Sequence, residues 1–154
     1  NLTGSQWLPV RSLLVSPGAC RVDSTSEVLV SLRLRLPERG SGAALARMDP
    51  QEDTGDASVM AVSVRLDSAP DLISALTLVM GTRGDSPRIA RLGELSDGHP
   101  PTVDAIRRTA AQWAAAQFIG PAGLPSRMHL AGHLANSVLD VAVDRARTSL
   151  ASAT

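Results

Sequence analysis

Residues 27–36, "EVLVSLRLRL", alternate cleanly in side-chain character, with Arg33 and Arg35 between their leucines, and this alternation constrains the fold more than any other feature of the chain. Residues 57–66, "ASVMAVSVRL", show the same period. A period of two with one apolar face is typical of a half-buried β-strand. We therefore expect both segments to be strands of one sheet, with their leucines and valines inward and their guanidinium groups outward.

A third extended segment is expected at residues 6–15, "QWLPVRSLLV", before the turn residues of 16–18. Pro9 restricts this segment to an edge strand or a strand start. Residues 37–56 lie between the two best strands and are rich in Gly, Pro and acidic side chains, so we expect a mobile loop with at most one helical turn near 43–48. Three to four strands with one wet face predict a small antiparallel sheet.

The second half of the chain is predicted to be helical from 69 to 150. Residues 68–80 carry Ser68 as an N-cap and apolar side chains at helical spacing, and 88–92 form a short extended piece. Thr102 caps a helix that runs to about residue 118, and a last helix runs from about 126 to 150. Strands followed by helices predict a single α+β domain over 1–154, in which an antiparallel helix hairpin covers one face of the sheet.

Composition excludes several function classes. The 154-residue chain is 44% hydrophobic with zero net charge, which indicates a globular domain without long-range attraction to nucleic acid. No run approaches the roughly 20 apolar residues of a membrane span. All 15 basic residues are arginine, which indicates a G+C-rich gene rather than selection for guanidinium groups.

Residues 83–87, Arg-Gly-Asp-Ser-Pro, contain the tripeptide that integrins recognise in adhesion proteins. Recognition of this type needs Arg83 and Asp85 on an exposed turn, with Gly84 between them. A chain rich in Arg, Gly and Asp also produces the triplet by chance, and short motifs carry this risk. We interpret the segment first as a turn, and integrin-type adhesion remains the third functional hypothesis.

His129 and His133 are four residues apart, so on a helix both would project from one face, as paired metal ligands do. The intervening "LAG" lacks the glutamate of the zinc-protease motif. Neither GxGxxG nor GxxxxGK[ST] occurs, and the single cysteine, Cys20, excludes an intrachain disulfide and a zinc site built from several cysteines. We expect no cofactor and identify no catalytic residue.

The outward arginines are the most organised polar feature, because Arg33, Arg35 and Arg65 would share the wet side of the sheet if their strands pair. The simpler interpretation is a solvated face neutralised by nearby acidic residues: Glu38, Asp49, Glu52, Asp53 and Asp56. A core nearly free of aromatics buries less area per side chain, and such domains gain burial against another chain.

The sequence therefore predicts a non-catalytic interaction or assembly module, a subunit of a homo-oligomer or of a larger protein complex. Its predicted partner contacts are Arg33, Arg35, Arg65, Arg83, Gly84 and Asp85. The alternative is a small enzyme or ligand-binding domain with a pocket between the sheet and the last two helices, lined by Trp113, His129 and His133, in which His129 and His133 would bind a metal ion.

Overall fold

The structure is a computed structural model that describes residues 4–16, 19–23, 25–34, 36–48, 58–67, 72–82, 87–96, 99–117 and 125–152. It divides into a smaller compact unit within Asn1–Leu36 and a larger one within Pro37–Thr154. The two units are described separately below. The organisation of residues 1–154 as a single domain stays a prediction.

The smaller unit contains a 3₁₀ helix, η1 (Val10–Ser12), and two short strands, β1 (Leu14–Ser16) and β2 (Ala19–Cys20), which pair antiparallel. The predicted strand over 6–15 is therefore wrong in extent and in partner. The predicted strand over 27–36 is also wrong, because its described residues have no regular structure and are exposed. Alternation alone does not make a strand, since backbone N–H and C=O groups also need a neighbouring strand.

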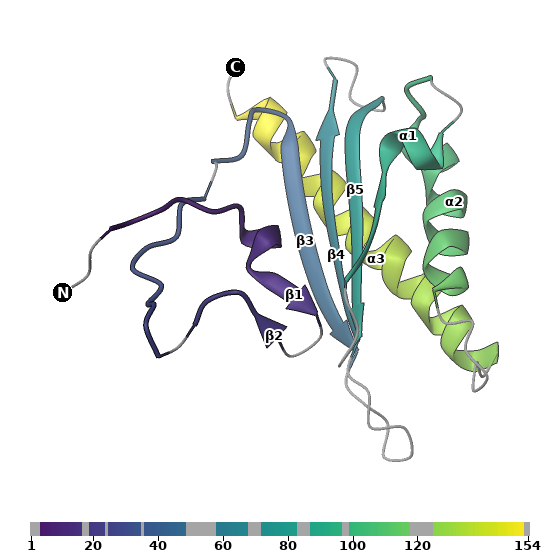
Figure 1. Cartoon of the computed structure of the whole chain (residues 1–154). Helices are drawn as coiled ribbons and strands as arrows, with labels where there is room; N and C mark the ends of the chain where they lie inside the picture. The colour runs from purple at the N-terminus through teal and green to yellow at the C-terminus, as the bar shows by residue number, and fades with distance from the viewer. Residues whose placement is uncertain are drawn as a thin grey trace. The chain divides into compact units, whose positions relative to one another are not determined.

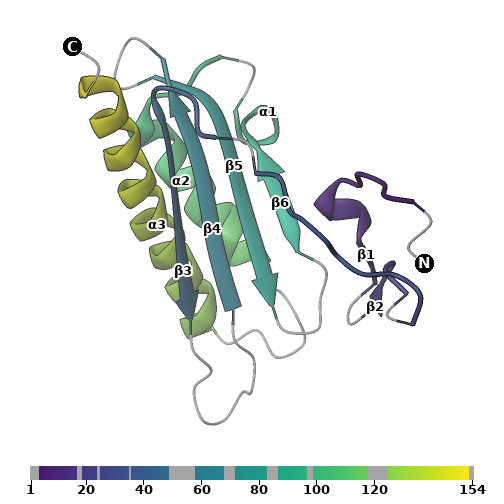
Figure 2. The same ribbon diagram turned by 90° about the vertical axis from the view of Figure 1, so that its left-hand side faces the viewer.

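The larger unit is built on a four-stranded antiparallel sheet in the order β3-β4-β5-β6 (Figure 1 and Figure 2). Its strands are β3 (Ser41–Met48), β4 (Ser58–Leu66), β5 (Ile73–Thr82) and β6 (Arg88–Arg91). The strand predicted over 57–66 is confirmed as β4, and its large apolar side chains are buried as expected. The short extended piece predicted over 88–92 is confirmed as β6.

Two strands occupy segments for which other structure was expected. Residues 41–48 were expected within a mobile loop, and they form β3 because they pair with β4 along their whole length. Residues 73–82 were expected to be helical, and they form β5. A β-bulge near Ser74 shifts the register, so that Ile73 and Leu76 both point inward. These two buried residues are three positions apart, which is the spacing expected of a helix.

Three helices follow the sheet: α1 (Leu92–Leu95), α2 (Val103–Ala116) and α3 (Pro125–Ala151). Thr102 caps α2 as predicted, since its Oγ1 accepts a hydrogen bond from Ala105 N at 3.3 Å. The helix α3 packs on β3 and β4, while α2 packs on α3 and β5, so both helices cover the same face of the sheet (Figure 2). This arrangement confirms the α+β class and the covering helix pair.

The core lies between the sheet and the helices and consists of Leu, Ile, Val, Ala and Met side chains, with Trp113 partly buried at its margin. Small residues fill the contact between α2 and α3, where Ala110, Ala114, Ala131 and Ala135 are buried. Helices that meet through alanine can approach closely. Among the described residues, no helix is long and apolar enough to cross a membrane.

Candidate functional site

The side of the sheet opposite α2 and α3, which we call the outer face, carries a continuous apolar row. Strand pairing places Leu45 beside Ala61, Ala61 beside Val79, and Val79 beside Ile89. The row therefore crosses all four strands at one level of the sheet. Val59 lies on the same face, two residues along β4, and extends the apolar surface.

The two ends of this row are strongly exposed. Leu45 is 68% exposed and Ile89 is 52% exposed, while Ala61 and Val79 between them are half-buried. An antiparallel sheet with one wet face normally places polar side chains there. A contiguous apolar patch on a sheet face is instead typical of a protein interaction site.

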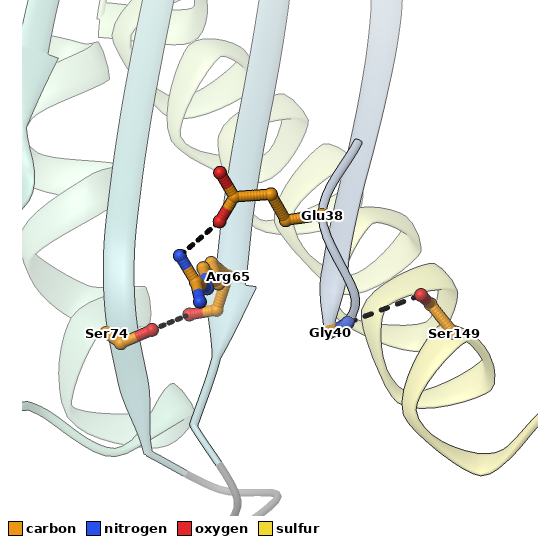
Figure 3. Close-up of polar contacts among 5 residues, drawn as sticks. All are labelled: Glu38, Gly40, Arg65, Ser74 and Ser149. Carbon is orange, nitrogen blue, oxygen red and sulfur yellow. Dashed lines mark hydrogen bonds and ion pairs between the residues drawn. The ribbon is translucent and has the colours of Figure 1, made fainter. Parts of the chain in front are cut away.

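Polar side chains border the row on the neighbouring level of the sheet, where Ser63 and Thr77 lie between Ala43 and Arg91. One level further, the Arg65 guanidinium donates to the Glu38 carboxylate (Figure 3). Both side chains are about half exposed, so this ion pair contributes only about 0–1 kcal/mol to stability. Polar side chains therefore border the apolar row on the side of Ser63 and Thr77.

The predicted arginine row is not formed. Arg65 projects from the outer face as expected, but β4 pairs with β3 and β5 rather than with residues 27–36. Arg33 belongs to the smaller unit, where its guanidinium stacks 4.6 Å from the centre of the Trp7 ring. Arg35 lies outside the described residues. The predicted neutralisation is observed for Glu38 alone, since 49–57 lie outside the described residues.

Strand β3 is an edge of the sheet. Leu66 N donates to Gly40 O at 2.9 Å, so the alternation of an antiparallel ladder turns the backbone groups of Ala43 and Leu45 away from β4. Arg145 of α3 donates to Ala43 O at 2.6 Å and covers that position. Leu45 has no such partner among the described residues, so the edge is accessible at the position where the apolar row begins.

The histidine pair lies on α3 with both rings exposed. His129 and His133 bring their Nε2 atoms to 3.0 Å, and their rings meet edge to face with centres 4.4 Å apart. The pair therefore does not line a pocket between the sheet and the helices, where apolar side chains form the core. Among the described residues, no group of three or more His, Cys, Asp or Glu is placed to hold a metal ion.

The other predicted contacts, Arg83, Gly84 and Asp85, lie outside the described residues, so integrin-type adhesion stays a hypothesis. Cys20 lies in β2 and is exposed.

A shallow depression of about 880 Å³ lies where β4 and β5 meet the end of α3. It is lined by three guanidinium groups, and each of them is engaged. Arg65 pairs with Glu38, Arg39 Nη2 donates to Leu150 O at 3.2 Å, and Arg147 lies 3.5 Å from the Asp144 carboxylate. Because these cations already have partners, the depression offers no strong site for an anionic ligand.

The residues of the apolar row are not among the predicted contacts, because two of its strands were predicted as a loop and a helix. Leu45 was assigned to the mobile loop, and Val79 to the predicted helix over 68–80. One feature of the sequence does indicate a strand rather than a helix over 73–82: the β-branched residues Ile73, Thr77 and Val79 favour β-structure.

Comparisons of the chain with protein-family models, with curated proteins and with solved structures find no match.

Proposed function

We propose that this chain is a non-catalytic assembly module that associates with a second copy of itself through the outer face of its four-stranded sheet. The observation that carries the proposal is the cross-strand row of Leu45, Ala61, Val79 and Ile89, which is exposed at both ends. Burial of apolar surface contributes roughly 25 cal/mol per Å². A second sheet packed on this face would gain that contribution.

The chemistry of the outer face supports contact with a protein surface rather than with a small ligand or nucleic acid. The row consists of apolar side chains only, with the shorter Ala61 and Val79 between the longer Leu45 and Ile89. Such a surface suits the packing of two sheets face to face, with the sheets about 10 Å apart. Nucleic-acid-binding sheets present aromatic side chains for base stacking. Leu45, Val59, Ala61, Val79 and Ile89, which form the apolar surface of the outer face, include no aromatic side chain.

The smaller unit supports association with another chain in general, because it also holds much exposed apolar surface. Six large apolar side chains of residues 28–36 are between 56% and 84% exposed. Surfaces of this kind are typical of chains that complete their burial in an assembly.

Two matched substitutions test the role of the outer face. Leu45→Glu places a charge within the apolar row, while Leu130→Glu places the same charge on the exposed side of α3, where Leu130 is 48% exposed. We expect Leu45→Glu to weaken self-association at least about tenfold, as measured by light scattering, since a buried unpaired carboxylate costs several kcal/mol. We expect Leu130→Glu to associate like the unmodified chain. Equal effects of the two substitutions would contradict the proposal.

A further inference from the structure

The first three turns of α3 present two imidazole rings on the molecular surface with their Nε2 atoms close together. His129 and His133 are one helical turn apart, and helical geometry places residues at this spacing on the same face. Their Nε2 atoms are 3.0 Å apart, and both rings are exposed. A single ion can therefore reach both nitrogens from solvent without any movement of the backbone.

We propose that His129 and His133 form a bidentate site for a late first-row divalent transition metal, with copper(II) as the preferred ion. This site is independent of the outer face, since it lies on the helical layer. The remaining coordination positions belong to water or to ligands from solution, because no third His, Cys, Asp or Glu joins the pair among the described residues.

Imidazole nitrogens favour copper(II) over nickel(II) and zinc, because the affinity of such ligands for divalent first-row metals is highest for copper(II). With metal–imidazole bonds of about 2.0–2.1 Å, two nitrogens that bind one ion lie about 2.9–3.3 Å apart. The observed separation of 3.0 Å falls within this range, so one ion can bind both rings.

The contact between the two rings requires a proton on one Nε2 atom, whereas metal binding requires that neither Nε2 atom carries a proton. In the metal-free chain, one Nε2 donates its proton to the other across the 3.0 Å contact. In the metal complex, both Nε2 atoms must carry a free lone pair, so both neutral rings hold their proton on Nδ1. Acid weakens binding because protons compete with the metal for these nitrogens.

The test is copper(II) titration by calorimetry, with all variants in a Cys20→Ser background because the exposed thiol is itself a copper ligand and reductant. We expect His129→Ala and His133→Ala each to weaken copper binding roughly 100-fold, since loss of either ligand removes the effective concentration of the second. His99→Ala removes an exposed histidine outside the pair and should leave the affinity unchanged.

Ser137 is exposed on the same helix, four residues after His133, and allows a control with a constant number of histidines. His129→Ala combined with Ser137→His restores the four-residue spacing and should recover the affinity to within about threefold of the parent, as one chelate replaces another. His133→Ala combined with Ser137→His leaves two histidines eight residues apart and should remain as weak as a single histidine.

Electron paramagnetic resonance gives an independent readout, because two equatorial nitrogens produce a characteristic superhyperfine pattern on bound copper(II). We expect that pattern in the parent and in the restored pair, together with the affinity order copper(II), nickel(II), zinc. Equal affinity of the two Ser137→His double variants would overturn the proposal. So would a parent affinity that neither single alanine substitution lowers. Metal-free circular dichroism confirms that each variant remains folded.

Discussion

Gly42 of β3 lies directly against Ala142 of α3, with no space for a side chain between the two backbones. A Cβ atom built on Gly42 would lie 1.9 Å from Ala142 O and 2.6 Å from Ala146 N. The small side chains at this crossing let α3 pack closely on the edge strand β3. The contact thus positions the strand on which Leu45, the first residue of the apolar row, is found.

We predict that Gly42→Ala destabilises the chain by about 1–3 kcal/mol or more, because the added methyl group must displace α3 backbone. The matched control is Gly81→Ala in β5, where a Cβ would meet nothing within 4 Å and φ is not positive. That control should be neutral or slightly stabilising, by up to about 1 kcal/mol. Urea unfolding of both variants measures the difference, and equal midpoints would show that α3 does not cross β3 at Gly42.

We predict that the carboxyl group of Asp23 titrates at a lower pH than an ordinary aspartate. Asp23 Oδ1 accepts hydrogen bonds from the Thr25 hydroxyl at 2.7 Å and from Thr25 N at 2.9 Å, and Oδ2 accepts one from the Ser26 hydroxyl at 2.8 Å. These bonds lower the pKa of Asp23 below its usual value, with the Thr25 hydroxyl as the largest cause. A lowered folded-state pKa means that the turn is stabilised above the unfolded-state pKa and loses this stabilisation as the pH falls through the folded-state value.

Carboxyl chemical shifts measured by NMR across the acid range test this prediction. We expect Asp23 to titrate below an ordinary aspartate, and Thr25→Val to raise the pKa of Asp23 towards the ordinary value. Ser31→Ala, an exposed serine outside the turn, serves as the control. A pKa of Asp23 that does not respond to Thr25→Val would refute the hydrogen-bonded turn.

Residues 27–36 illustrate where sequence patterns fail. Their alternation predicts a strand, yet the described part of this segment is exposed and unpaired, and β3 takes the position beside β4 instead. Alternation identifies which side chains would share a face, but it does not identify the partner strand. The same pattern over 57–66 does form a strand, because β3 and β5 supply hydrogen bonds on both sides of it.

The exposed state of this segment has a measurable consequence. Leu32 is 56% exposed and Leu34 is 75% exposed, so the double substitution to serine should change the unfolding free energy of the monomeric chain by less than about 0.5 kcal/mol. Leu78→Ala, at a fully buried position of β5, should cost about 2–5 kcal/mol. A loss of several kcal/mol in the Leu32→Ser, Leu34→Ser variant would mean that these leucines belong to a core.

The helical half shows which elements local sequence does determine. The α2 helix was predictable because capping and apolar periodicity agree, as Thr102 and the buried Ile106 illustrate. The α3 helix was predictable from its apolar periodicity. The candidate site was not predictable, because the apolar row joins residues from four strands and depends on the bulge near Ser74 and on strand order. Of the predicted partner contacts that the structure describes, Arg65 alone projects from the outer face.

Sedimentation velocity over a concentration series measures whether the chain self-associates, and the Leu45→Glu variant shows whether the outer face is responsible. We predict a concentration-dependent shift from the 16.1 kDa monomer to a dimer in the micromolar range. The Leu45→Glu variant should remain a monomer across the same series. An unmodified chain that sediments as a monomer at every concentration up to the millimolar range would refute self-association through the outer face.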